Sequence, residues 1–437
     1  MKWSQRFAYL ACSLSIGVFS SFNNFTLSLW LSTFTTSYFL ISLMGNTRSF
    51  EGALISPATG AWSDRTWLGW LGRRRPFILV GGLSSALLLA ATPHIARLPL
   101  PVDLAEVGWL PADVGTLAPA ILAIFLFTMA FNVMDDIHSA LMVDLTPPGA
   151  ERNWLSSLKV VTNMAGQAGI LILGAFLWHD GVPDSAFLVT GGIMAAGVLS
   201  TVLGVREPAP GAAVSDASVR SESGQDSGER ATLGTFWTHY RGAMVFCLVW
   251  FAYWFGVNAV LPLVSLYTRD ILGASVGEAQ LLPAVLLLST TLFAAPMAML
   301  GTRYGKRRVF SAGLAVMGVA ALTGLVITTK EMGAVVFLLA GVGNAASMVL
   351  HLPLMADLVP RRHMGAAAGI LAASASIAAP LASAMAGGLS DTFGPRVIFA
   401  MMAVFTGLAL VLMLGVRRQA EPAGERLAMA TPQAQPV

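Results

Sequence analysis

The chain has 437 residues and a formal net charge of +3, with 55% hydrophobic residues, 11% charged residues and a mean hydropathy of +0.70. These values are typical of a chain that is surrounded mostly by lipid, and they exclude an ordinary water-soluble core. The small positive charge favours a role in membrane orientation over nucleic-acid binding, because the basic residues lie in loops between apolar stretches.

Twelve apolar stretches are long enough to cross the ~30 Å hydrocarbon layer of a bilayer, which requires about 20 helical residues. The first begins directly after Lys2 and Trp3. It has no clear small-residue cleavage site, so we expect it to be retained. We therefore predict an all-α membrane protein with twelve transmembrane helices. Their expected ranges are 7–32, 39–61, 75–93, 118–144, 153–178, 185–205, 242–268, 279–300, 308–328, 334–357, 364–388 and 395–416.

Lysine and arginine residues gather in the loops on one side of this topology. These loops contain Arg65 and the run 73–75 after span 2, Arg303 and the run 306–308 after span 8, and Arg361 and Arg362 after span 10. Basic residues next to membrane spans remain on the cytoplasmic side. We therefore expect both termini in the cytoplasm and the protein in the plasma (inner) membrane.

A polar segment at residues 206–237 divides the spans into two groups of six and is predicted to be a flexible cytoplasmic linker. The two groups resemble each other, since Leu-Met-Val-Asp-Leu-Thr-Pro at 141–147 recurs as Leu-Met-Ala-Asp-Leu-Val-Pro at 354–360. We predict two six-helix pseudo-repeats at 1–205 and 238–418, with a disordered cytoplasmic tail at 419–437. Related halves imply a substrate site on the axis between them, as in rocking transporters.

Two segments resemble a known family. The hairpin Gly60-Ala61-Trp62-Ser63-Asp64-Arg65, followed by Gly72-Arg73-Arg74-Arg75-Pro76-Phe77-Ile78, resembles the signature loop of the major facilitator superfamily, and its sucrose-transporter group most closely. Residues 134–146 are similar to helix 4 of the glycoside–pentoside–hexuronide cation symporters, in which an aspartate at the place of Asp135 contacts the sugar. Sucrose carriers have an arginine where this chain has Ser139, so the resemblance does not imply sucrose itself.

The resemblance, which covers roughly residues 1–418, also implies a gate. In this superfamily the matching hairpin holds the two halves together on the cytoplasmic side, and Gly60 would allow close helix contact. Asp144 and Asp357, each near the base of a repeated helix, are assigned to the same gate. The implied gating residues are Gly60, Asp64, Arg65, Arg73, Asp144 and Asp357.

Ionisable side chains inside the spans are few, and each is costly in hydrocarbon unless it is paired or hydrated. They are Arg48, Glu51, Asp135, Asp136 and Lys159. Three acids face two bases, so one carboxylate must be protonated, bind a cation or contact water. We predict Asp136 or Glu51, with Lys159 and Arg48, as the coupling groups, and H⁺ as the coupling ion with Na⁺ as the alternative. A purely structural ion pair between helices 4 and 5 is the competing interpretation.

Helical spacing places Thr128, Asn132, Asp135, Ser139 and Met142 on one stripe of helix 4, which we expect to face substrate or water. His138 points away from this stripe and is expected to pack rather than relay protons. A tryptophan ring next to amides could bind a sugar, which has apolar ring faces and hydroxyl edges. Anchoring at the membrane interface is the alternative explanation for tryptophans in a membrane protein. The predicted substrate-binding residues are Asn24, Asn132, Asp135, Ser139, Asn163, Trp254, Asn258 and Asn344.

The sequence shows no recognisable metal-ligand cluster, phosphate-binding loop or nucleophile motif, so we expect no enzyme, no metal and no cofactor. The favoured function is proton-coupled symport of a sugar or glycoside, with the bilayer and a small-molecule substrate as partners and a monomer as the functional unit. The alternatives are a proton-coupled exporter of amphipathic compounds and, in a different class, a membrane-bound sensor. A sensor should carry a folded output domain, and the linker and tail are short and polar.

Overall fold

The computed structural model describes residues 2–46, 51, 59, 62–63, 65–98, 114–147, 150–207, 239–360 and 363–416. Within these ranges the chain is helical, and the only β feature is one isolated bridge between Leu68 and Gly72. The predicted all-α class is therefore confirmed.

The N-terminal helices agree with the predicted spans to within a few residues. Of the second span, expected at 39–61, the structure describes only residues 39–46, 51 and 59, so most of it lies outside the described residues. The elements are α1 (Trp3–Ser21), η1 (Phe22–Thr26), α2 (Leu27–Leu31), α3 (Tyr38–Met44), η2 (Gly69–Leu71), α5 (Arg75–Ile95), α6 (Val114–Leu145), α7 (Ala150–Leu177) and α8 (Asp184–Gly204).

The C-terminal helices also follow the predicted spans, with one difference. The span expected at 242–268 is divided at residues 261–263, where Pro262 cannot donate a backbone N–H to a continuous helix. The elements are α11 (Arg241–Val260), α12 (Val264–Asp270), η4 (Glu278–Gln280), α13 (Leu281–Tyr304), α14 (Lys306–Gly324), α15 (Lys330–Ala356), α16 (Met364–Phe393) and α17 (Val397–Gly415).

Nine helices within the described ranges are long and apolar enough to cross a membrane. The continuous helical run of α1, η1 and α2 covers residues 3–31 in addition to these. The chain is therefore an integral, multi-pass membrane protein.

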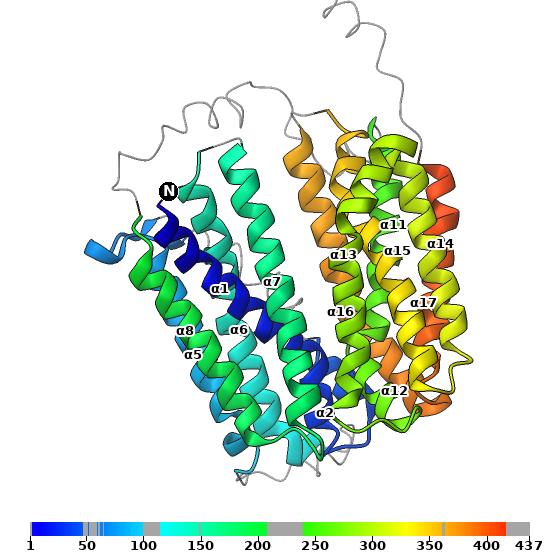
Figure 1. Ribbon diagram of the computed structural model, residues 1–437, viewed down its shortest axis with the longest axis horizontal. Coiled ribbons are helices and arrows are strands. Elements are labelled where there is room, and N and C mark those ends of the chain that lie inside the picture. The colour runs from blue at the N-terminus through cyan, green and yellow to red at the C-terminus, as the bar shows by residue number, and fades with distance from the viewer. Residues whose placement is uncertain are drawn as a thin grey trace, which may run out of the picture.

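The helices form two groups that stand side by side (Figure 1). In the N-terminal group α1 packs against α7 and α8, and α5 packs against α6 and α8. In the C-terminal group α11 packs against α16 and α17, while α15 packs against α13 and α14. We call the end where α1 begins and α17 ends the terminal end, and the opposite end, which holds α2 and α12, the far end (Figure 1).

The two groups meet through α3 with α16 and through α7 with α13. Glycine permits the first contact, since a Cβ atom at Gly387 would lie 2.2 Å from Ser42 Oγ and 2.5 Å from Phe39 Cα. Inside the N-terminal group, a Cβ atom at Gly17 would lie 1.9 Å from the Asn163 carbonyl oxygen. Glycines therefore allow close helix contacts both between the two groups, at α3 and α16, and within the N-terminal group, at α1 and α7.

Candidate functional site

A cavity of about 800 Å³ lies between the two halves and is lined by both. Its wall presents amide and hydroxyl groups together with one acid. Among the described residues that line it, Asp136 is the only ionisable side chain. The polar side chains on the wall are Asn24, Asn46, Asn132, Asp136, Gln167, Asn258, Thr290, Thr291, Asn344 and Ser376.

Several predicted substrate-binding residues do lie on this wall, namely Asn24, Asn132, Trp254, Asn258 and Asn344. Asn24 belongs to η1, a π-helical turn inside the first membrane helix. Such π turns occur frequently at functional sites, because they reorient side chains within an otherwise regular helix.

On α6 the structure places Asp136, rather than Asp135, on the cavity wall. Asn132 and Asp136 are four residues apart and share one helix face, whereas Asp135 is rotated by about 100° from Asp136. Asn132 of the predicted stripe lies on the cavity wall, whereas Asp135 and Ser139 do not line it, and their role in substrate binding stays a prediction. Thr128, the first member of the stripe, is fully buried and donates to the Ile124 carbonyl oxygen at 2.7 Å.

Asp135, Ser139 and Lys159 form a group beside the cavity. Lys159 Nζ donates to Ser139 Oγ at 2.6 Å, and that hydroxyl donates to the Asp135 carbonyl oxygen at 3.0 Å. The predicted ion pair between Lys159 and Asp135 or Asp136 stays a prediction.

The other two predicted coupling residues belong to the second span. Glu51 is buried, with 3% of its surface exposed, in agreement with a position inside the protein. Arg48 lies outside the described residues. Their pairing also stays a prediction.

His138 packs between helices, as its position on α6 predicts. It is fully buried, and its ring stacks on Tyr9 with centroids 4.1 Å apart. His138 Nε2 lies 3.1 Å from the Tyr9 carbonyl oxygen, and the Tyr9 hydroxyl donates to the His138 carbonyl oxygen at 3.2 Å. This reciprocal contact fixes α1 against α6.

Gln167 is a wall residue that the sequence reasoning missed. Its Nε2 donates to Asn163 Oδ1 at 2.8 Å, and Asn163 Nδ2 donates to the Ser13 carbonyl oxygen at 3.3 Å. Asn163, predicted to contact substrate, thus orients Gln167 and contacts α1. The spacing of four residues between Asn163 and Gln167, which places both amides on one helix face, could have identified Gln167 from the sequence.

The C-terminal wall combines one tryptophan with two ordered amides. Trp254 faces the cavity, whereas Trp250 is 4% exposed and stacks on Tyr253 and His351, with centroids 4.9 and 4.4 Å away. Asn258 Nδ2 donates to the Trp254 carbonyl oxygen at 2.8 Å. Asn344 Nδ2 donates to Thr290 Oγ1 at 3.0 Å, so these amides are held in fixed orientations.

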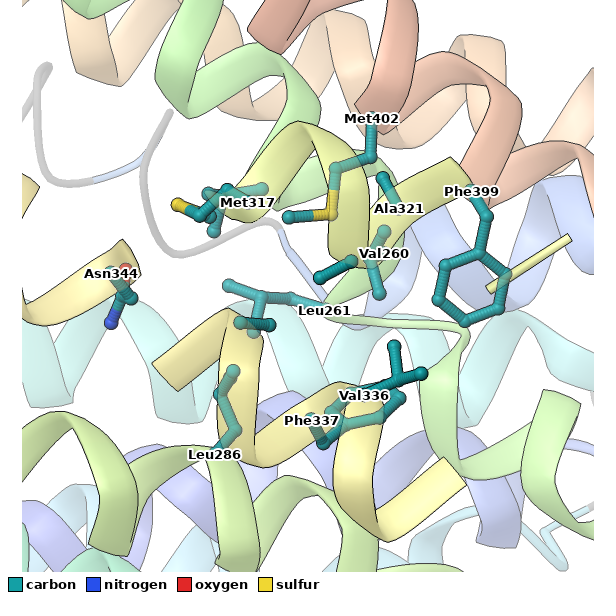
Figure 2. Close-up of a pocket in the computed structure, with 13 residues that line it drawn as sticks. Val260, Leu261, Leu286, Met317, Ala321, Val336, Phe337, Asn344, Phe399 and Met402 are labelled. Atoms are coloured by element: carbon teal, nitrogen blue, oxygen red, sulfur yellow. The ribbon is translucent and has the colours of Figure 1, made fainter. Parts of the chain in front are cut away.

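A small apolar side pocket of about 40 Å³ adjoins the cavity inside the C-terminal half (Figure 2). It shares Val257, Leu261, Leu286 and Asn344 with the cavity wall. Its remaining walls are hydrophobic and include Met317, Val336, Phe337, Phe399 and Met402. A space of this kind accepts an apolar group better than water.

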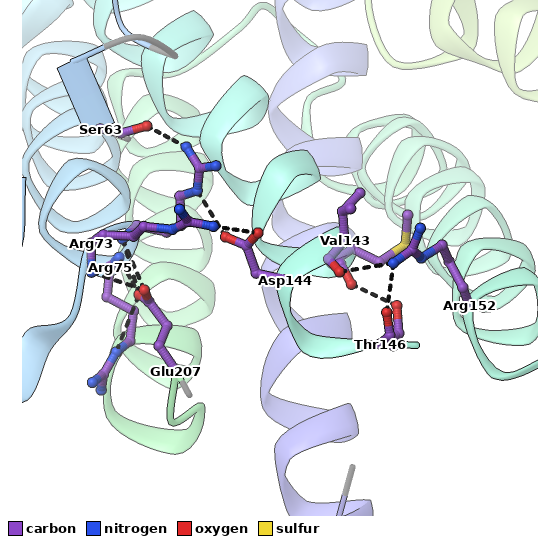
Figure 3. Close-up of polar contacts among 10 residues, drawn as sticks. Ser63, Arg73, Arg75, Val143, Asp144, Thr146, Arg152 and Glu207 are labelled. Carbon is purple, nitrogen blue, oxygen red and sulfur yellow. Dashed lines mark hydrogen bonds and ion pairs between the residues drawn. The ribbon is translucent and has the colours of Figure 1, made fainter. Parts of the chain in front are cut away.

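A charged network lies at the terminal end of the N-terminal half (Figure 3). Asp144 accepts from Arg73 Nη2 at 2.7 Å and from Arg74 Nε at 2.9 Å. Arg74 also donates to Ser63 Oγ. The predicted gating residues Arg73 and Asp144 thus bond to each other, within one half.

Glu207 completes this network and was missed by the sequence reasoning (Figure 3). Its carboxylate accepts the backbone N–H groups of Arg73, Arg74 and Arg75 at 2.8, 3.0 and 2.9 Å, at the beginning of α5. Gly72 has φ +75° and approaches so closely that a Cβ atom there would lie 2.7 Å from the Glu207 carboxyl carbon. Glu207, expected in the flexible linker, is instead fixed with 3% of its side chain exposed.

The C-terminal half has a similar network at the same end. Lys306 Nζ donates to Asp357 Oδ1 at 2.8 Å, and Arg307 Nη2 donates to the Met413 carbonyl oxygen at 2.7 Å. Arg65 is exposed, while Gly60 and Asp64 lie outside the described residues. The gating role of all these residues stays a prediction.

At the far end, hydrogen bonds join the two halves directly. Asp391 accepts from Ser37 Oγ at 3.0 Å and from the backbone N–H groups of Tyr38 and Phe39 at 2.6 and 3.1 Å. Deeper in the protein, Asn46 Nδ2 donates to Asn258 Oδ1 at 2.9 Å and to Ser383 Oγ at 2.8 Å. Asn258 therefore belongs both to the cavity wall and to the far-end contact.

The arrangement of the whole chain matches known transporters. It superposes on the crystal structure of a D-xylose-proton symporter with a TM-score of 0.72 and 15% identity, covering 97% of this chain and 99% of that one. The chain has the major facilitator fold. A nucleoside transporter, NupG, matches with a TM-score of 0.68 and 13% identity, over 95% of this chain and 98% of that one.

Sequence comparison supports the same superfamily. The family model described as Major Facilitator Superfamily matches residues 246–436. A curated relative, the acurin A biosynthesis cluster MFS-type transporter of Aspergillus aculeatus, is 29% identical over 143 residues. That match covers 31% of this chain and only 24% of the relative. The finer resemblance to sugar–cation symporters stays a prediction.

No group of histidine, cysteine, aspartate or glutamate side chains within the described part of the chain could hold a metal ion. Cys12 and Cys247 are buried free thiols.

Proposed function

We propose that this protein is a secondary active transporter that moves a sugar or glycoside together with protons by alternating access. One observation carries the proposal: a cavity of about 800 Å³ lies between two halves that are hydrogen-bonded at the far end. The basic residues of the terminal end would face the cytoplasm, so the cavity would be reached from the cytoplasmic side in this conformation. Rocking of the halves would expose it to the other side.

The chemistry of the wall supports a neutral, hydroxyl-rich substrate. Amides donate and accept hydrogen bonds, as a sugar hydroxyl does, and Trp254 offers an apolar face to a sugar ring. No lysine, arginine or histidine lines the cavity among the described residues, which disfavours an anionic substrate. Asp136 would accept charge-assisted hydrogen bonds from substrate hydroxyls.

Proton coupling would use the acids of α6. An ionised carboxylate in the membrane interior is costly unless it is paired or hydrated, so a proton or a substrate hydroxyl at Asp136 lowers that cost. The neighbouring group of Asp135, Ser139 and Lys159 supplies a second ionisable site that is separate from the cavity wall. Substrate and proton would then be linked through adjacent residues of one helix.

A thermal-shift screen of sugars and glycosides on the purified protein tests the substrate class, with nucleosides and organic acids as comparison sets. Asp136→Asn should abolish the shift that a binding sugar produces, and Asp184→Asn, which changes a far-end surface carboxylate paired with Arg97, should keep it. Stabilisation by organic acids and not by sugars would exclude the proposed substrate class.

Vesicle uptake then tests the coupling ion. We expect an inward proton gradient to drive accumulation of the sugar that the screen identifies, with no response to a Na⁺ gradient. Uptake that follows Na⁺ and ignores pH would show that the carboxylates bind Na⁺ instead.

The side pocket favours a second candidate, a transporter of amphipathic compounds. Its apolar walls adjoin the polar cavity, so a molecule with one polar and one small apolar part would fill both spaces. Alkyl and aryl glycosides, compared with the free sugars in the same screen, distinguish the candidates. Stronger binding of apolar compounds that lack a sugar would favour the exporter.

A further inference from the structure

A groove of about 300 Å³ lies between α13, α14 and α15, apart from the central cavity. Gly313 and Gly343 line it and allow α14 and α15 to approach closely, since a Cβ atom at Gly343 would lie 2.5 Å from the Gly313 carbonyl oxygen. The groove extends along α14 from Arg308 to Val316. Eight residues of helix span about 12 Å, which is most of one ~15 Å lipid leaflet.

The groove is apolar along its length and positively charged at its terminal end. Arg308 lines it there together with Tyr304, and the Arg303 guanidinium lies 5.3 Å from the centre of the Tyr304 ring. Arg303 and Arg308 are both exposed. Within the described ranges, neither arginine forms an ion pair with a carboxylate, and the nearby Asp357 bonds to Lys306.

At the matching end of the N-terminal half, the basic run is paired with two carboxylates of the same half. There the run Arg73-Arg74-Arg75 contacts the carboxylates of Asp144 and Glu207. The end of α8 and the residues after it read Leu-Gly-Val-Arg-Glu at 203–207, and the end of α17 and the residues after it read Leu-Gly-Val-Arg-Arg at 414–418. The second repeat therefore has an arginine in place of the glutamate that contacts the basic run of the first.

We propose that this groove binds an anionic phospholipid. One acyl chain would lie in the groove against Leu300, Ala312 and Val316, and the phosphate would contact Arg303 and Arg308. Basic pockets between transmembrane helices attract anionic head groups, and tyrosine is favoured at the membrane interface. The lipid would supply the negative charge that Glu207 supplies in the other half.

Native mass spectrometry of the full-length protein with phosphatidylglycerol and phosphatidylcholine of identical acyl chains tests the proposal. We expect the wild type to retain phosphatidylglycerol about tenfold better, since two cationic contacts favour the anionic head group. The double variant Arg303→Gln/Arg308→Gln should lose that preference. Ala312→Trp, which fills the groove without changing charge, should reduce retention of the anionic lipid.

Arg97→Gln is the matched control, because it removes an exposed arginine at the far end and should leave the preference unchanged. Equal retention of both lipids by the wild type would overturn the proposal, as would an unaltered preference in the double variant. Displacement of the lipid by an equal concentration of inorganic phosphate would show an anion site rather than a lipid site. The readout requires no transport, so it is independent of the proposed function.

Discussion

The two ends of the molecule use their polar side chains in different ways. At the far end, hydrogen bonds cross between the halves, as at Asp391 with the beginning of α3 and at Asn46 with Asn258. At the terminal end, Arg74 pairs with Asp144 and Lys306 pairs with Asp357, each within its own half. Among the described residues, these contacts join the halves at the far end, whereas the ion pairs at the terminal end stay within each half, an arrangement that agrees with the proposed movement about the central cavity.

The largest effect is expected at Glu207, which belongs to the terminal end. Glu207→Ala would leave three backbone N–H groups without their acceptor and would remove the carboxylate that lies 3.7 Å from the buried Arg75 guanidinium. Loss of one partner from such a buried site costs about 3–5 kcal/mol. Unfolding of the purified protein should show this loss, and Glu207→Gln, which keeps an acceptor oxygen, should lose less. Wild-type stability in the alanine variant would show that this contact does not hold the N-terminal half together.

The next effect is expected at the far end, where Gly387 allows α16 to approach α3. Gly387→Leu should separate these helices, at about 1–3 kcal/mol for the overpacked contact. Gly388→Leu is the control, because a Cβ atom there meets only Phe39 Cδ2, at 3.9 Å. Spin labels at the exposed residues 36 and 392 should report a longer distance in the first variant only. An equal change of the label distance in both variants would show that the close approach at Gly387 has no specific role in holding the halves together.

A smaller effect is expected for Asp391→Ala. The exposed carboxylate accepts three hydrogen bonds from the other half, and their loss should weaken the far-end contact by about 1 kcal/mol, roughly fivefold in population. The same label pair measures it. Thr323→Ala should have no effect, since the Thr323 hydroxyl bonds to carbonyl oxygens of its own helix.

The smallest effect is expected for Arg97→Gln, which breaks the exposed pair with Asp184 inside the N-terminal half. Exposed ion pairs contribute little, and this one joins no helices across the halves. Unfolding and the far-end distance should both match the wild type. A clear shift in that distance would mean that contacts within one half also set the contact between halves.

Apart from the second span, most of which lies outside the described residues, and the break at residues 261–263, the spans were predictable because hydropathy and length determine them locally. The observed helix ends differ by only a few residues. Five residues of the cavity wall were also predictable, four as amides inside apolar helices and Trp254 as an aromatic residue next to them. The rotation of α6 about its axis, which decides whether Asp135 or Asp136 lines the cavity, was not predictable. Both Asp135 and Asp136 continue a polar stripe from Asn132, and the choice depends on packing of Met134 against Gly81 and Gly82 of α5.

Glu207 was missed for a similar reason. The polar composition around Glu207 predicted a linker. Its hydrogen-bond partners at the beginning of α5 lie more than a hundred residues earlier in the chain, so the local sequence does not reveal them. Contacts of this kind depend on where α8 ends relative to α5, which no local pattern encodes.

The central claim is that the two ends open alternately around the cavity, and distance measurements on one protein test it most directly. In a Cys12→Ser/Cys247→Ser background, one label pair would occupy the exposed far-end residues 36 and 392, and another the exposed terminal-end residues 154 and 302. We predict that a sugar identified by the screen shortens the terminal-end distance and lengthens the far-end distance in a common fraction of molecules. Distances that stay fixed, or that lengthen together at both ends, would contradict alternating access.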